Sequence, residues 1–182
     1  MKTIGIVAEY NPFHAGHAYQ ISCVRKNFSE IIAVMSGSFT QRGEPAILDK
    51  WTRASLAIEG GCDLVIELPF TSAVRSAQDF ARGAIRLLNR LGVVDKLVFG
   101  AETSDLEKLK SLAKINLSDD VKKFLAEGSS YANAVGKILS ADKLQPNTIL
   151  AIEYLRALPD TIKPILIERI GAGYNDLNLQ KN

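Results

Sequence analysis

The sequence has few cysteines and histidines, no long apolar run and no large excess of charge, and these absences argue against several classes of protein. Its 182 residues include two cysteines and two histidines. Cys23 and Cys62 stand singly in apolar surroundings, without a CxxC pair, so we expect buried, reduced thiols and no structural zinc. No apolar run approaches the roughly 20 residues that a membrane span needs, and the N-terminus does not read as a signal peptide. A cytoplasmic location is therefore the default expectation.

An excess of charge of one sign is also missing. The chain has 22 Lys and Arg against 20 Asp and Glu, a formal net charge of +2. Domains that bind nucleic acid usually carry a marked basic excess or a basic stripe, so charge alone does not indicate an RNA partner. The hydrophobic content of 47% is enough for a globular core at this length.

Short apolar runs recur at intervals and alternate with helical patterns. The predicted strands are 3–8, 30–37, 63–69, 96–102 and 162–171. Helical patterns cover 15–27, 49–61, 75–92, 104–113, 118–126, 130–140 and 146–158. Asp49 and Ser118 are predicted N-caps, Pro146 suits a first turn, and the glycines at 60–61 and 92 suit helix ends.

Strands that are apolar throughout and alternate with helices are typical of a parallel sheet covered on both faces. We therefore predict an α/β fold, a doubly wound Rossmann-like sheet of about five strands in the order 3-2-1-4-5. In such sheets ligands bind beyond the carboxyl ends of the strands, where the strand order reverses. The site is expected over strands 1 and 4.

Both histidines lie in one short stretch, "HAGH", on the turn that leaves the first strand. Gly16 permits close backbone approach, and the following helix directs N–H groups and a partial positive charge at whatever lies there, which suits a phosphate. The imidazoles of His14 and His17 can add donors that strengthen as charge develops on a phosphoryl group. Surface or helix-capping histidines are the alternative. A zinc site is less favoured, because no third histidine or cysteine completes it.

The stretch "SGSFTQRGEPAILDKWTR" after the second strand is long and polar, as expected of a loop at a site. Gln41, Arg42, Lys50 and Arg53 are candidates to hold a second substrate or phosphates. For Lys50 and Arg53, an ordinary solvated helix face is an equal alternative. Trp51 is expected to pack and not to stack on a base.

Six blocks occur in an order that resembles one known family. They are "GIVAEYNPFHAGH", "MSGSFTQRGEPAILDKWTRA", "GCDLVIELPF", "VFGAE", "NTILAIEYLRAL" and "ERIGAGYND", between residues 4 and 176. "HAGH" is similar to the HxGH signature of the nucleotidyltransferase superfamily. The set of blocks resembles the N-terminal catalytic part of the tRNA(Met) cytidine acetate ligase family.

The resemblance implies a ligase that joins acetate to ATP, with Mg²⁺, and transfers the acetyl group to N4 of the wobble cytidine of elongator tRNA(Met). It implies His14 and His17 as catalytic residues. It further implies an ATP-binding set comprising Val7, Ala8, Glu9, Tyr10, Asn11, Pro12, Phe13, His14, Ala15, Gly16, His17, Ala18, Tyr19, Gln20, Gly100, Asn147 and Arg169. No residue is predicted to be a dedicated metal ligand.

Three of these assignments have ordinary structural alternatives. Gly100 ends the fourth strand, where bare backbone lets a nucleotide approach, or where the chain simply turns. Asn147 at a helix start can offer its amide to a nucleotide or cap the helix. Arg169 can clamp a phosphate or pair with surface carboxylates.

The chain departs from the family pattern at Asn175, where histidine is usual. We expect one ATP-binding domain over 1–176 and a polar tail at 177–182. The superfamily's second phosphate-binding signature, and the basic surface for tRNA, are expected beyond that domain. Two other functions stay open: a small-molecule adenylyltransferase, and a nucleotide-binding module without turnover.

Overall fold

The computed structural model describes residues 2–115, 118–129, 131–138 and 145–168. Within these ranges five strands form one sheet in the order β3-β2-β1-β4-β5. The strands are β1 (Thr3–Ala8), β2 (Glu30–Ser36), β3 (Leu64–Leu68), β4 (Lys96–Ala101) and β5 (Lys163–Glu168). Every neighbouring pair is parallel. The predicted α/β fold and strand order are confirmed.

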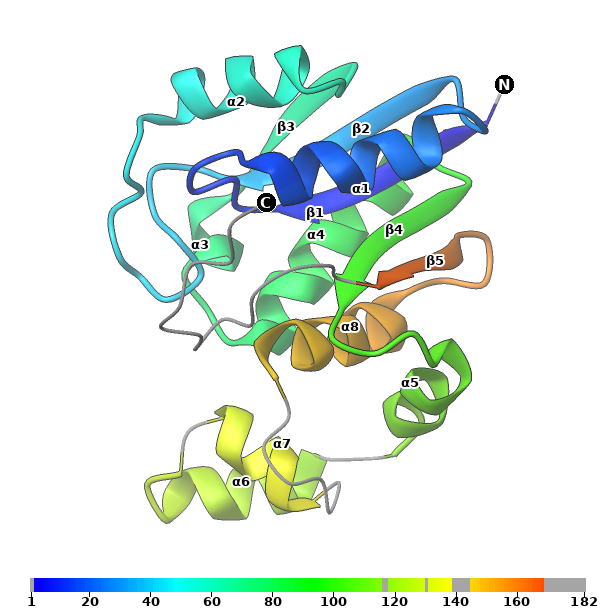
Figure 1. Ribbon diagram of the computed structural model, residues 1–182. Helices are drawn as coiled ribbons and strands as arrows, with labels where there is room; N and C mark the ends of the chain where they lie inside the picture. The colour runs from blue at the N-terminus through cyan, green and yellow to red at the C-terminus, as the bar shows by residue number, and fades with distance from the viewer. Residues whose placement is uncertain (1, 116–117, 130, 139–144, 169–182) are drawn as a thin grey trace, which may run out of the picture.

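Helices cover both faces of this sheet. Those in the described ranges are α1 (Ala15–Arg25), α2 (Lys50–Glu59), α3 (Phe70–Ala73), α4 (Ala77–Leu91), α5 (Leu106–Ala113), α6 (Ser118–Ala126), α7 (Tyr131–Ile138) and α8 (Pro146–Ala157). Helices α1 and α2 lie over one face, and α4 and α8 lie over the other (Figure 1). Only the four-residue α3 was absent from the sequence-based prediction.

The core is divided by the sheet into two apolar clusters. Alternate residues of β2 enter opposite clusters: Ile31, Ala33 and Met35 face α1 and α2, while Ile32 and Val34 face α4. This period-2 pattern on a strand buried on both faces explains why its sequence is apolar throughout. Cys62 lies in the first cluster as expected, whereas Cys23 is exposed, contrary to the expectation of two buried thiols.

Side chains at the helix ends account for where the helices start and stop. Asp49 caps α2 through the N–H groups of Trp51 and Thr52, as predicted, and Pro146 occupies the first turn of α8. Gly92 ends α4 in the left-handed region, with φ of 70°. No helix among the described residues is long and apolar enough to cross a membrane.

The sheet order places the reversal of chain direction between β1 and β4. From β1 the chain adds β2 and then β3 on one side, and it returns to add β4 and β5 on the other side. The carboxyl ends of β1 and β4 therefore meet at one edge, which is where this class of sheet binds ligands. The turn after β1 and the start of α8 both lie near that edge (Figure 1).

Candidate functional site

The two histidines form the start of α1. His14 is the N-cap in extended conformation, and its Nδ1 accepts the N–H of Gly16 at 3.1 Å. The Nδ1 atom of His17 in turn accepts the N–H of His14 at 3.2 Å. The two hydrogen bonds make a reciprocal capping box from a residue type that rarely serves this purpose. A Cβ at Gly16 would lie 3.0 Å from Cε1 of His14, so a larger residue would crowd the ring.

This capping arrangement fixes how each ring presents its other nitrogen. A nitrogen that accepts an N–H carries no proton, so each neutral imidazole has its proton on Nε2. The rings are stacked, with centroids 3.8 Å apart and planes 25° apart. Capping and phosphate contact were alternatives for these residues on sequence grounds. The structure shows the capping, and because it uses Nδ1 of each ring it does not exclude a contact through Nε2–H.

The rings of Tyr10 and Phe13 also pack against the imidazole of His17. Tyr10 lies edge-on to His17 at 4.8 Å between centroids, and the Phe13 ring lies 5.5 Å from His17. Tyr10 is buried, and its hydroxyl lies 3.8 Å from Sγ of Cys62. Burial, with Cys62 alongside, raises the pKa of Tyr10 far above its ordinary value, so its hydroxyl stays neutral. The backbone of Tyr10 has φ of 47°, a conformation that costs a non-glycine residue about 1 kcal/mol.

The turn after β1 is tied to the loop after β2. The carboxylate of Glu9 accepts the N–H of Gln41, and Oδ1 of Asn11 accepts the N–H of Ile47 at 2.7 Å. Gln41 uses its side-chain amide to donate to the carbonyl of Arg75 at 2.7 Å. The two loops, residues 9–14 and 37–49, therefore form one connected edge, although more than thirty residues separate their bonded positions.

Arg53 lies beneath this edge with none of its surface exposed. Its guanidinium donates to the carbonyl oxygens of Glu9, Ser36, Gly37 and Leu48. Burial lowers the pKa of Arg53, and nearby carboxylates oppose this effect. Both expectations for Arg53, phosphate contact and a solvated helix face, need correction, because its donors are used by main-chain oxygens at the ends of two strands. We assign it the role of positioning the site loops.

The neighbouring basic residues lie in different surroundings. Nζ of Lys50 forms an ion pair with Oε2 of Glu67 at 2.7 Å, at the end of β3. Arg42 is exposed in the loop before Gly43. Trp51 has 74% of its surface exposed, which contradicts the expectation that it packs. Lys50 lies 5.3 Å from the Trp51 ring centroid, within cation–π range.

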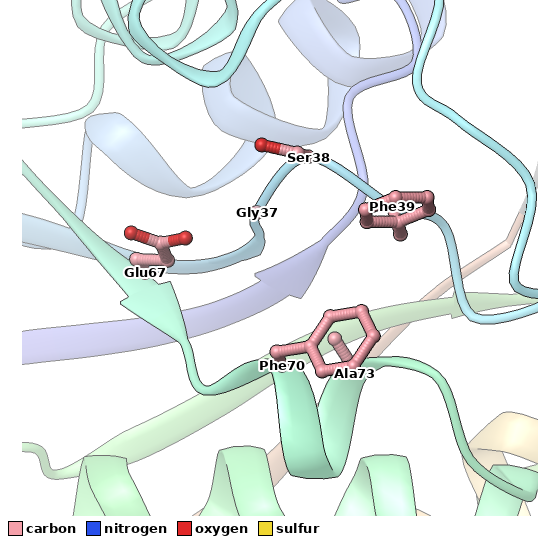
Figure 2. A pocket seen from close by; sticks show the side chains of 6 residues that line it. All are labelled: Gly37, Ser38, Phe39, Glu67, Phe70 and Ala73. Atoms are coloured by element: carbon pink, nitrogen blue, oxygen red, sulfur yellow. The ribbon is translucent and has the colours of Figure 1, made fainter.

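A small pocket of about 160 Å³ opens beside this loop at the ends of β2 and β3. Phe39 and Phe70 meet edge to face with centroids 5.5 Å apart, and the carboxylate of Glu67 lies on the other side near Gly37 (Figure 2). The pocket is displaced from the histidines toward β3. It adjoins the candidate site and is not the histidine turn itself.

The start of α8 differs from the start of α1. Glu102, just after β4, accepts hydrogen bonds from Nδ2 of Asn147 at 2.7 Å and from the N–H and hydroxyl of Thr148 at 2.8 and 2.7 Å. Burial tends to raise the pKa of Glu102, but the bonds from Asn147 and Thr148 outweigh it and lower that pKa overall. Asn147 follows the cap position, which Gln145 occupies. A carboxylate thus already lies on the positive end of α8.

The structure brings most of the predicted site residues to one edge. Residues 7–20 form the end of β1, the turn and the first half of α1. The last paired positions of β1 and β4 are Ile6 and Val98, and two residues further on come Ala8 and Gly100. Asn147 lies at the start of α8 near the same edge. Arg169, Asn175 and the predicted tail at 177–182 lie outside the described residues.

Sequence reasoning missed two acidic residues at this edge, Glu67 and Glu102. Glu102 ends its predicted strand and Glu67 lies near the carboxyl end of its own, a position that is a usable signal in a parallel sheet. Their partners, Lys50 and Asn147, lie 17 and 45 residues away along the chain, which no local pattern reveals. Among the described residues, no group of three or more His, Cys, Asp or Glu could hold a metal ion.

Comparisons with known proteins agree with this fold. The family described as HIGH Nucleotidyl Transferase matches residues 1–182. A tRNA(Met) cytidine acetate ligase of Caldicellulosiruptor bescii is 43% identical over 198 residues, covering 100% of this chain and 49% of the relative. One from Fusobacterium nucleatum is 43% identical over 184 residues, covering 96% of this chain and 46% of the relative.

Two solved structures of TmcAL from Thermotoga maritima resemble the chain at 38% identity. The apo form gives a TM-score of 0.83 over 99% of this chain and 48% of that one. The form bound with alpha-thio ATP gives 0.79 over 94% and 47%. The chain spans about half the length of the relatives that it matches. With the family match over its whole length, the chain belongs to the HIGH nucleotidyl transferase family, and it is similar to about half of a tRNA(Met) cytidine acetate ligase.

Proposed function

We propose that this chain is the ATP-binding part of a ligase that activates acetate and acetylates N4 of the wobble cytidine in elongator tRNA(Met). The observation that carries the proposal is the paired imidazole cap at the start of α1, in a chain of this family whose solved relative binds alpha-thio ATP. Residues 1–176 would act as one domain. A cytoplasmic location, where ATP and tRNA occur together, belongs to the same proposal.

In the proposed reaction an acetate oxygen attacks the α-phosphorus of ATP and pyrophosphate leaves. N4 of the cytidine then attacks the acetyl carbonyl of acetyl-adenylate, loses a proton and releases AMP. The Nε2–H groups of His14 and His17, with the N–H groups at the start of α1, would donate to phosphate oxygens. These donors strengthen as negative charge develops, so they contribute more in the transition state than in the bound substrate.

The donor set of the described residues fits a phosphate-bound Mg²⁺ better than a protein cage. Imidazoles and main-chain N–H groups are poor magnesium ligands, and Mg²⁺ commonly keeps waters and binds substrate phosphates through few carboxylates. When bound, Mg²⁺ would neutralise charge on the phosphates of ATP. The chain's own residues would orient the triphosphate against α1 and keep the two loops in place through Arg53.

The remaining candidate contacts are part of the same proposal. Gly100 and Asn147 would lie near the nucleoside, because they follow β4 and start α8 at the same edge as the histidine turn. Arg42, which is exposed in the loop after β2, would contact a second substrate. Gln41 and Lys50 are held by Arg75 and Glu67, so we expect them to shape the loop more than to bind.

Calorimetry with ATP, followed by acetate-dependent pyrophosphate exchange and an acetylcytidine assay on the same preparation, tests the proposal. We expect this chain to bind ATP and to acetylate tRNA(Met) poorly or not at all, whereas a full-length relative should do both. Failure to bind ATP would contradict the nucleotide site. AMP-linked products from a metabolite mixture, without acetate-dependent exchange, would indicate a small-molecule adenylyltransferase. ATP binding by a full-length relative without any exchange would indicate a module without turnover.

A further inference from the structure

A row of arginines lies on the outer face of α4. Arg82, Arg86 and Arg90 are four residues apart, which places them on one side of the helix, and all three are exposed. The opposite side of α4 is buried against the sheet through residues such as Phe80, Ala84 and Leu88. This burial fixes the orientation of the helix, so the arginines cannot turn inward.

The charges of this row are not compensated inside the described part of the chain. No ion pair there involves Arg82, Arg86 or Arg90. Nearby, Arg75 is paired with Asp79 at 3.2 Å, so the one carboxylate of this surface already has a partner. Like charges four residues apart destabilise a helix. Binding of an external partner of opposite charge would relieve this repulsion.

The row lines a groove and does not stand on a convex surface. The groove has a volume of about 380 Å³ and lies between α3 and α4, with the side chains of Thr71, Ser72 and Arg75 along the α3 side. Its floor depends on Gly83, where a Cβ would lie 2.5 Å from Ser72. Arginine forks beside hydroxyl donors are the usual means of holding phosphate oxygens without reading bases.

The groove begins at the candidate site. The carbonyl of Arg75 accepts the side-chain amide of Gln41, which belongs to the loop joined to the histidine turn. Phe70 of α3 lines the smaller pocket at the ends of β2 and β3. From Arg82 to Arg90 the helical rise amounts to roughly 12 Å, so a few consecutive phosphates can lie along the row.

We propose that the α3–α4 arginine groove, defined by Arg75, Arg82, Arg86 and Arg90, binds the sugar–phosphate backbone of an RNA strand and leads it toward the site edge. The inference rests on the proposed function for the choice of RNA, and on charge and shape for the choice of surface. It places an RNA-binding surface within these 182 residues, whereas the net charge of +2 gave no sign of one.

The test uses this chain with elongator tRNA(Met) transcript as the probe, over a series of salt concentrations. The variant Arg82→Gln/Arg86→Gln/Arg90→Gln should weaken tRNA binding by about 10–100-fold and reduce the slope of log K against log salt by roughly 2–3. The variant Arg82→Lys/Arg86→Lys/Arg90→Lys should stay within about 3-fold of the original, because charge supplies most of the affinity and the lost guanidinium fork accounts for the remaining difference.

A matched control removes three positive charges elsewhere. Lys26, Lys108 and Lys114 are exposed and do not line the groove, so Lys26→Gln/Lys108→Gln/Lys114→Gln should leave the affinity within about 3-fold. The arginine variant should melt no lower than the original chain, because it removes like-charge neighbours from an exposed face. Its ATP affinity, measured by calorimetry, should be unchanged.

The possible failures separate the two proposals. If the original chain binds ATP but not tRNA, or if the glutamine variant binds tRNA as tightly as the lysine control, the groove proposal is overturned and the nucleotide site stands. If polyglutamate of matched charge binds the groove as tightly as tRNA and loses binding in the same variant, the surface takes an acidic protein partner and RNA is excluded. Loss of ATP binding by the original chain would overturn the proposed function itself.

Discussion

Two helices, α1 and α8, begin near the edge where β1 and β4 end, and groups of different charge lie at their N-termini. At α8 the carboxylate of Glu102 occupies the helix end and accepts donors from Asn147 and Thr148. At α1 the cap consists of two imidazole nitrogens, and the first turn has no acidic residue. An anion from the protein already lies at the α8 end, whereas at α1 the capping acceptors among the described residues are imidazole nitrogens.

The difference indicates where a triphosphate would bind. The partial positive charge of a helix start attracts an anion, but a second anion beside Glu102 would meet repulsion. Among the described residues no carboxylate caps α1, and the stacked rings of His14 and His17 add donors. We therefore expect the α1 end to receive the phosphates, and the α8 end to contribute to the architecture of the nucleoside side.

The largest expected effect comes from removing an imidazole at the α1 end. In a full-length relative, replacing the residue equivalent to His17 by Ala should lower acetate-dependent pyrophosphate exchange by about 10²–10³-fold, roughly 3–4 kcal/mol, with a smaller change in ATP affinity. Gln at this position can complete a capping box without an imidazole. His17→Gln should therefore keep the fold and show a similar loss of exchange. Full exchange by His17→Gln would reduce His17 to a capping residue.

The second effect concerns the support beneath the α1 end. Arg53→Ala removes the donor from four main-chain carbonyl oxygens, two of them buried, and should lower the free energy of unfolding by about 3 kcal/mol. Arg53→Lys keeps one charged donor and should cost about half as much. Urea denaturation of both variants measures the difference. Equal stability of Arg53→Ala and the original chain would contradict the positioning role.

At the α8 end the expected effect is smaller and depends on pH. The pKa of Glu102 is lowered in the folded chain, so its contribution is present above its unfolded value of 4.5 and is lost as pH falls through the lower folded value. Glu102→Gln should reduce stability at neutral pH by about 1 kcal/mol and flatten this part of the acid dependence. ATP affinity should change by less than about 3-fold.

A large gain in ATP affinity for Glu102→Gln would contradict the expected difference between the two helix ends. It would show that the α8 end accepts phosphates once its own carboxylate is neutral. Thr148→Ala is the matched control, since it removes one donor to Glu102 and keeps the carboxylate charged. Calorimetry of ATP binding to Glu102→Gln and Thr148→Ala at neutral pH separates the charge of Glu102 from its hydrogen bonds.

The smallest expected effect separates capping from phosphate contact at His14. His14→Ala removes the side-chain cap and should cost about 1 kcal/mol, whereas His14→Asn restores an acceptor and should cost a few tenths. Chemical denaturation of the two variants measures this. If both variants are equally destabilised, the ring contributes packing in place of a cap, which would contradict the capping role of His14.

The contrast between the two helix ends also shows which features of the site can be predicted from the sequence. Apolar runs predicted the strands. Gly16 and the helical pattern after it predicted that His14 and His17 lie on the turn after the first strand. The burial of Arg53 did not follow, because an arginine in a helix is usually exposed and its carbonyl partners come from two strand ends and a loop. The four-residue α3 is too short to show a periodic pattern.

Glu102 shows the same limit at the α8 end. Its contacts join residues 45 and 46 positions apart, so only the folded sheet reveals that the helix already has an anion. Asn147 was correctly placed at a helix start, yet its amide donates to the protein and the cap itself is Gln145. Local signals therefore predict which elements meet, while the side-chain pairing at the meeting point depends on tertiary contacts.

Whether the α1 end receives the phosphates can be measured directly by ¹⁵N NMR. The chain contains two histidines, so their imidazole nitrogens can be followed individually. Without nucleotide, both rings should show the Nε2–H tautomer. On addition of ATP with Mg²⁺, both imidazoles and the amides of Gly16 and His17 should shift, with the dissociation constant found by calorimetry. ATP binding that leaves both rings unmoved, or that shifts only the amides of Asn147 and Thr148, would contradict the claim that the α1 end receives the phosphates.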